Sequence, residues 1–245
     1  MNVLMLASYG LEIVECGGAL ARAVAAGDTV NAAVLMCRED SKPQVSKAAS
    51  VLGIEDVDYL DVPFGEVDLA PATKVKVVEL IRRTKPDVVI MQDPEHAQHD
   101  LDPDRRVIAI LYAEALAVAG RDWRVEECGG HQPHRIPTIY YMTPENPNCV
   151  VEIADVLELK LRAVEALSSQ NTFSAEHWRS ATSDDVLRAV VPAWSDGDLE
   201  TLGREGQRVI FTSLALSNGL ASHSGAVLGE AYRREGSFVL ERLTP

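Results

Sequence analysis

The side chains best suited to chemistry are gathered in one acidic segment, residues 92–105. It contains His96 and His99, separated by two residues, and the carboxylates Asp100 and Asp102 follow closely. Two imidazoles with neighbouring carboxylates suffice in principle to bind a divalent metal ion. The other interpretation is a solvated loop whose aspartates cap the helix that follows. We favour the capping interpretation and keep the metal site as the alternative.

A second polar segment follows an apolar stretch, residues 3–7, that is typical of a buried strand. The hydroxyls of Ser8 and Tyr9 could bind a ligand there. Glu12 could act as a general base, although an acid in the first turn of a helix more commonly complements the helix dipole. No Gly-x-Ser-x-Gly turn surrounds Ser8, so we do not expect a serine nucleophile.

Strand and helix patterns alternate along the chain. Apolar, β-branched stretches predict strands at 3–7, 30–36, 57–60, 88–91 and 136–142. Helical periodicity predicts helices at 17–26, 43–52, 71–84, 105–119 and 155–169, and a last one near 225–235. This alternation indicates an α/β, Rossmann-like three-layer fold with a mostly parallel sheet. We expect a single domain over residues 1–245, with 171–245 as a C-terminal embellishment.

Ligand sites in such folds lie beyond the carboxyl ends of the strands, where the strand order reverses. The loops that meet this condition are 8–15, 61–68 and 92–105. The sequence therefore predicts that these three loops converge on one pocket.

Two motifs in these loops resemble the LmbE-like/PIG-L de-N-acetylase family. The first is the strand followed by Ser8-Tyr9-Gly10-Leu11 and then by Gly17-Gly18-Ala19-Leu20-Ala21, and the second is Asp102-Pro103-Asp104-Arg105. Residues 47–54, 151–163, Ser169-Gln170 and 229–232 resemble further family segments in the same order. The resemblance implies the LmbE-like fold. It also implies descent from zinc-dependent deacetylases, which act on N-acetylated amino sugars.

The positions that matter most for the family's chemistry have changed. Ser8, Leu11 and Arg105 stand where the family has its three zinc ligands, Gly10 where it has the general base, and Asp102 where a histidine polarises the substrate carbonyl. Since serine, leucine and arginine offer no good ligand set, we expect no metal ion or other cofactor there. Arg105 could instead take over the electrostatic role of the metal.

Substrate recognition differs from the family pattern as well. Ser41 and Gln44 fall where many members have an arginine and a glutamate, Phe64 where a substrate-contacting aspartate is usual, and Leu167 where a histidine commonly precedes the Ser-Gln pair. The family's sugar specificity is therefore not expected to transfer unchanged.

We consequently interpret the chain as a small-molecule-binding pseudoenzyme or a repurposed metal-independent enzyme. The candidate catalytic residues are Glu12, Asp102 and Asp104. The predicted pocket comprises Ser8, Tyr9, Gly10, Leu11, Phe64, His99, Asp100 and Arg105. The expected ligand is a polar or anionic small molecule, such as an amino-sugar-like compound or a specialised metabolite. The alternative is a hydrolase, either a de-N-acetylase or an amidase, with a rebuilt metal site. The ligands of that site would be His96, His99 and neighbouring carboxylates, and His131 is a further candidate ligand.

Composition limits the partners. The chain has 245 residues and a net charge of −14, with a pI near 4.8, so it lacks the basic surface that nucleic acid or an anionic membrane would need. No apolar run reaches the roughly 18 to 20 residues that span a bilayer. No basic, apolar leader is visible at the N-terminus. We expect a cytoplasmic protein, and its four cysteines show no Cys-x-x-Cys spacing.

Overall fold

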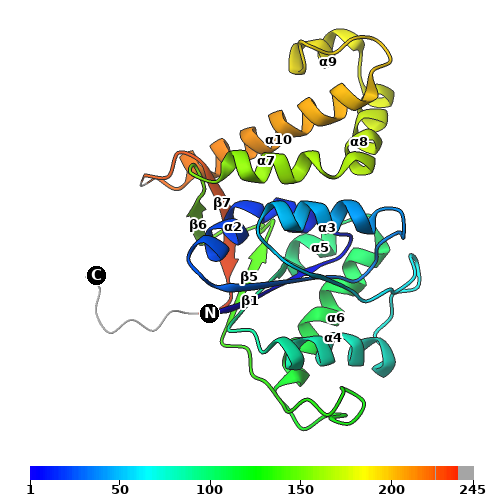
Figure 1. The fold of residues 1–245 in the computed structure, drawn as a ribbon, viewed down its shortest axis with the longest axis vertical. Helices are drawn as coiled ribbons and strands as arrows, with labels where there is room; N and C mark the ends of the chain where they lie inside the picture. Colours follow the sequence, from blue (N-terminus) through cyan, green and yellow to red (C-terminus); the bar gives the residue numbers. More distant parts are fainter. Residues whose placement is uncertain (224, 237–245) are drawn as a thin grey trace.

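The computed structural model describes residues 1–223 and 225–236, which form a seven-stranded sheet flanked by helices (Figure 1). The strands are β1 (Asn2–Ala7), β2 (Thr29–Val34), β3 (Val57–Tyr59), β4 (Val88–Gln92), β5 (Thr138–Met142), β6 (Cys149–Glu152) and β7 (Gly229–Arg234). Their order is β3-β2-β1-β4-β5-β7-β6. The first five pair in parallel, and β7 is antiparallel to both of its neighbours. The predicted α/β fold with a mostly parallel sheet is confirmed.

Helices cover both faces of this sheet (Figure 1). One face carries α4 (Pro71–Thr84) and α6 (Pro103–Ala119), and the other carries α2 (Gly17–Ala25), α3 (Lys42–Val51) and α7 (Leu157–Glu165). Two short helices, α1 (Leu11–Glu15) and α5 (Pro94–His99), lie in the loops after β1 and β4. The remaining helices are α8 (Ser168–Ala181), α9 (Asp184–Val190) and α10 (Leu199–Ala221).

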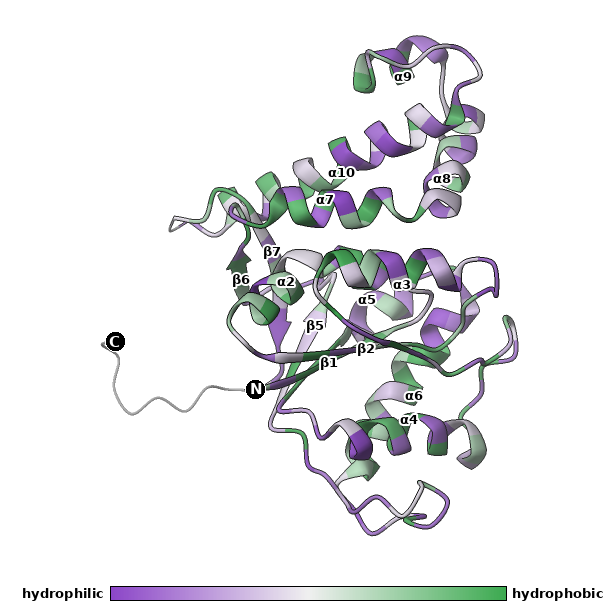
Figure 2. Cartoon of the chain, viewed as in Figure 1, coloured by the Kyte–Doolittle hydropathy of each residue, from purple (hydrophilic) through white to green (hydrophobic). Residues whose placement is uncertain are grey.

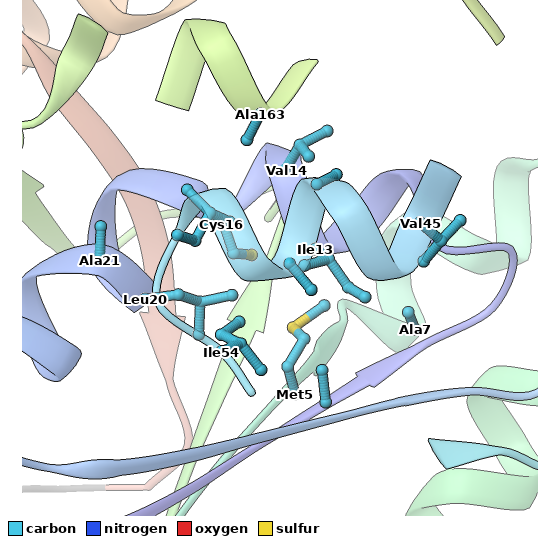
Figure 3. Close-up of a cluster of buried hydrophobic side chains, with 14 of the residues drawn as sticks. Met5, Ala7, Ile13, Val14, Cys16, Leu20, Ala21, Val45, Ile54 and Ala163 are labelled. Atoms are coloured by element: carbon cyan, nitrogen blue, oxygen red, sulfur yellow. The ribbon is translucent and has the colours of Figure 1, made fainter. Parts of the chain in front are cut away.

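Strand β1 divides the core because successive side chains of a strand point to opposite faces. Its odd-numbered residues, including Met5 and Ala7, belong to the cluster under α2, α3 and α7, whereas Leu4 and Leu6 belong to the cluster under α4 and α6. Figure 3 shows Met5 among the side chains of the first cluster, near Leu20. A strand that is apolar on both sides, as the sequence indicated, is what a three-layer fold requires.

The segment 229–234 corrects one prediction. We expected a helix near 225–235, but Gly229–Arg234 forms strand β7 between β5 and β6. Without β7, the edge of β5 would be left unpaired, and its pairing with β5 and β6 supplies backbone hydrogen bonds that local helical preference does not. Long-range pairing thus decided the conformation of this segment.

Glu230 of β7 anchors the start of α2. Its two carboxylate oxygens accept hydrogen bonds from the backbone N–H groups of Gly18 and Ala19, both at 2.8 Å. The buried ammonium of Lys160 on α7 donates to the same carboxylate at 2.6 Å and to the carbonyl of Glu15 at 2.7 Å. A side chain at Gly18 would collide with this arrangement, since a Cβ there would lie 2.8 Å from the Glu230 carboxylate.

The C-terminal helices have a small core of their own. Trp194 on the connection to α10 packs with Leu187 of α9 and Ala175 of α8. Helices α8 and α10 approach closely because Gly203 and Gly206 face Asn171 and Trp178 respectively. Hydrophobic and hydrophilic residues alternate along α10 (Figure 2).

The division of the chain into one domain with 171–245 as an embellishment stays a prediction, and residues 224 and 237–245 lie outside the described ones. Among the described residues no helix is both long and apolar enough to cross a membrane.

We predict that Lys160→Met lowers the free energy of unfolding by about 3 to 5 kcal/mol, because it leaves the buried Glu230 carboxylate without its cation. The double variant Lys160→Met/Glu230→Gln should recover part of this loss, since it removes the buried charge while the glutamine oxygen still accepts from one of the two α2 amides. Urea denaturation of the two single variants and the double variant tests this. Strictly additive losses would contradict it.

Candidate functional site

The loops after β1, β2 and β4 meet beyond the carboxyl ends of these strands. In the order β3-β2-β1-β4-β5, the connections change direction between β1 and β4, which is where such folds place ligands. Backbone bonds extend the pairing of β1 and β2 past their ends, from Leu35 N–H to the Ala7 carbonyl and from Met36 N–H to the Ser8 carbonyl, both at 3.0 Å. A pocket of about 470 Å³ lies at this place.

The pocket brings together residues from all three predicted loops. Tyr9 and Leu11 come from the loop after β1, Phe64 from the loop after β3, and Asp102 and Arg105 from the segment after β4. The three loops therefore converge on one pocket, as the sequence predicted from the expected topology.

Arg105 lies at the centre of a set of carboxylates. Its guanidinium nitrogens are 3.5 Å from a Glu12 oxygen, 3.6 Å from an Asp100 oxygen and 3.9 Å from an Asp102 oxygen. Nη1 also donates to the Gln92 side-chain oxygen at 3.4 Å. Burial lowers the pKa of Arg105, but the neighbouring charges, led by Glu12, more than offset this and raise it overall. The guanidinium is a permanent cation that its own chain already neutralises.

The carboxylate of Glu12 is bound by backbone N–H groups of the turn that precedes α1. Its Oε2 accepts from the backbone N–H groups of Tyr9 and Gly10 at 3.2 and 3.0 Å, and the side chain is only 1% exposed. Its Oε1 has no hydrogen-bond partner and faces Arg105. Gly10 makes the turn possible, because its φ of 99° is left-handed and a Cβ would lie 2.9 Å from Val45.

One wall of the pocket is a stack of four side chains. The rings of Tyr9 and Phe64 are stacked at 5.7 Å, with Arg105 over the Tyr9 ring at 5.0 Å and Arg38 over the Phe64 ring at 5.9 Å. The Tyr9 hydroxyl donates to Asp102, and burial together with this bond raises the pKa of Tyr9. Tyr9 is consequently a neutral hydrogen-bonding residue and not a base.

The aspartates after β4 have structural roles. Asp102 caps α6 by accepting from the Asp104 N–H at 2.9 Å, which confirms the capping interpretation. Asp104 is buried and accepts from the Gly65 N–H at 2.7 Å, so it fixes the neighbouring loop. Asp100 accepts from the Asp102 N–H at 2.9 Å. Of the three candidate catalytic carboxylates, Asp102 lines the pocket, whereas Glu12 lies behind Arg105 and Asp104 points to the loop.

Several predicted pocket residues lie elsewhere. Ser8 is 2% exposed and does not line the pocket, and Gly10 and Asp100 also lie outside its lining. His99 is exposed at the end of α5.

The residues of the metal-site alternative do not converge either. His96 pairs with Glu145 at 2.8 Å, and His131 is 3.6 Å from Glu79. Across residues 1–223 and 225–236, no group of three or more His, Cys, Asp or Glu side chains is placed to bind a metal ion.

The pocket also contains residues that the sequence singled out for another reason. Ser41, Gln44 and Leu167, which depart from the family pattern, all line it, as do Ser169 and Gln170. Gln44 joins α3 to α8 by donating to the Ser169 hydroxyl at 2.6 Å and accepting from the Ser169 N–H at 2.9 Å. These bonds hold α8 over the pocket.

Sequence reasoning missed Cys37, Arg38 and Phe173, which line the pocket as well. Cys37 and Arg38 follow the end of β2, so the rule about carboxyl ends of parallel strands could have found them. Burial raises the pKa of the Cys37 thiol to about 11, which keeps it protonated at neutral pH. No local pattern marked Phe173, because α8 reaches the pocket only through tertiary packing.

Comparison with known proteins gives the fold a family context. No family model matches the chain. Over 136 residues the chain is 34% identical to the diacetylchitobiose deacetylase of Thermococcus kodakarensis, a match that covers 54% of this chain and 49% of that protein. The matched stretch thus spans about half the length of that relative.

Two solved structures have the same fold along nearly the whole chain. The N,N'-diacetylchitobiose deacetylase of Pyrococcus horikoshii has a TM-score of 0.69 at 20% identity, covering 95% of this chain and 82% of its own. The 4-carboxy-2-hydroxymuconate hydratase of Pseudomonas putida has a TM-score of 0.70 at 18% identity, covering all of both chains. The similarity to a deacetylase that the sequence indicated is found again: part of the chain is similar in sequence to one diacetylchitobiose deacetylase, and the fold is shared with another.

Glu15, at the end of α1, makes the stability of the fold depend on pH. Burial and the nearby Glu12 charge raise its pKa from 4.5 to about 7. The folded state therefore binds this proton more tightly than the unfolded state, so the contribution of Glu15 to stability is greatest below pH 4.5 and is lost as the pH rises to about 7. We predict that this contribution falls by about 3 kcal/mol across the window and that Glu15→Gln abolishes the fall. Urea denaturation at pH 5 and pH 8 measures it, with exposed Glu126→Gln as the control; an unchanged slope in Glu15→Gln would refute the assignment.

Proposed function

We propose that the pocket binds a polar small molecule without the zinc ion of the related deacetylases, either as a binding protein or as a metal-independent enzyme. The observation that carries this proposal is the position of Arg105. It stands where the resemblance places a zinc ligand, and its guanidinium is enclosed by the carboxylates of Glu12, Asp100 and Asp102.

The residues at the family's metal positions do not fit zinc. A zinc site needs about three His, Asp, Glu or Cys ligands, and Ser8, Leu11 and Arg105 supply none of these residue types. The nearby carboxylates are already paired with a guanidinium that cannot lose its proton. Bringing a dication next to this cation would also be electrostatically unfavourable.

The fold itself leaves the reaction open. Its relatives are named as a deacetylase and as a hydratase, and a fold does not determine the chemistry of its site. If the chain is an enzyme, Asp102 is the carboxylate placed to exchange a proton with a ligand, since it is the candidate that lines the pocket. If it is a binding protein, Ser41, Gln44 and Gln170 supply hydrogen bonds to a polar ligand.

The test is the zinc content of the purified, tag-free protein after incubation with zinc and exhaustive dialysis. We expect far less than one zinc per chain. The triple variant Ser8→His/Leu11→Asp/Arg105→His, which restores the three ligand types, should gain zinc relative to the matched variant Ser8→Ala/Leu11→Ala/Arg105→Ala. Retention of about one zinc by the unmodified chain would overturn the proposal.

A further inference from the structure

The two arginines of the pocket lining differ in how far the described part of the chain neutralises them. Arg105 has three carboxylates around it, whereas Arg38, at the other end of the same stack, has no ion-pair partner within residues 1–223 and 225–236. The Arg38 guanidinium lies over Phe64, and its side chain is exposed. A guanidinium left unpaired at the rim of a pocket is ready to accept a carboxylate or phosphate from a ligand.

The charge of the remaining lining supports the same conclusion. Two arginines face a single carboxylate, Asp102, which already accepts from Tyr9 and lies near Arg105. Cys37 and Tyr9 are neutral because their pKa values are raised. Since the carboxylates around Arg105 already match its charge, Arg38 is the uncompensated charge among the described lining residues. A ligand ammonium group would find no unpaired carboxylate there, which argues against a free amino sugar.

Apolar surface marks the second part of the ligand. Phe64, after β3, and Phe173, on α8, both line the pocket and remain 48% and 64% exposed. Large aromatic side chains that stay exposed around a pocket are available to cover an apolar or planar group. Leu11, Val45 and Leu167 add aliphatic surface to the same lining.

We propose that the ligand is an organic anion with a planar, apolar body: Arg38 binds its carboxylate or phosphate, and Phe64 and Phe173 cover the body. This inference rests on the proposed function, since it specifies the ligand class of the same pocket. The sequence suggested Arg105 as the group that binds an anion. The structure favours Arg38 for this role, because carboxylates of the chain already pair with Arg105.

Calorimetric titration of the full chain with 2-naphthoate, 2-naphthyl phosphate and the uncharged 2-naphthamide tests the proposal. At least one anion should bind about tenfold or more tightly than the amide. Arg38→Gln should abolish this preference and Arg38→Lys should retain an intermediate one, since lysine keeps the charge but not the planar fork. Arg179→Gln, which removes an exposed arginine away from the pocket, is the matched control and should leave the preference unchanged.

The outcomes separate the two proposals. Preference for 2-naphthoate alone assigns a carboxylate ligand, and preference for the phosphate alone assigns a phosphate ester. Equal affinity for 2-naphthamide and the anions, or tighter binding of N-acetylglucosamine than of either anion, would overturn the anion inference and leave the zinc-free pocket intact. Failure of both anions to bind at millimolar concentration, with normal folding by circular dichroism, would also overturn it. Only stoichiometric zinc in the unmodified chain removes the proposed function itself.

Discussion

The carboxylate of Glu230 joins elements that are far apart in the sequence. It accepts the first free N–H groups of α2 and pairs with Lys160 of α7, and it is carried by the strand that closes the sheet between β5 and β6. Because an uncompensated buried charge is costly, these three elements are stable only together. Lys160 also binds the carbonyl of Glu15, at the end of α1. The helix that carries Glu12 toward the pocket is thereby fixed through the same cluster.

A second group of charges shapes the pocket itself. Three carboxylates converge on Arg105, and the arginine in turn packs on Tyr9. Each carboxylate is also bound by backbone N–H groups or by a hydroxyl, so hydrogen bonds within the chain position the cluster. A site that is organised in this way presents hydrogen-bonding groups and aromatic surface to a ligand. It does not present a set of free carboxylates and imidazoles.

The comparison with relatives fits this description. The fold is shared over nearly the whole chain with a deacetylase and with a hydratase, but sequence identity in those structures is 20% and 18%. A shared fold does not determine the chemistry of the site that it carries. The residues that differ from the family pattern, Ser41, Gln44, Phe64 and Leu167, all lie in the pocket lining. Ser8 and Gly10 also depart from that pattern and lie outside the lining, so only some of the departures face the pocket.

The sequence by itself determined the layers of this protein. Alternating apolar patterns located β1 to β5 and the helices α2, α3, α4 and α6 to within a few residues, because burial on two faces imposes a periodicity that can be read locally. It also identified the loops that meet at the pocket, since parallel strands end at the same edge.

Tertiary structure decided what local patterns do not contain. Strand β7 forms because the sheet offers a partner on each side, and α8 brings Phe173 to the pocket through its bonds to Gln44 and its packing on α10. Tertiary structure also decides the balance of charge in the pocket. Among the described residues, carboxylates pair with Arg105 and not with Arg38, because of the distances between residues from different loops. Coulomb interactions follow distance in space, and the order of residues along the chain does not fix that distance.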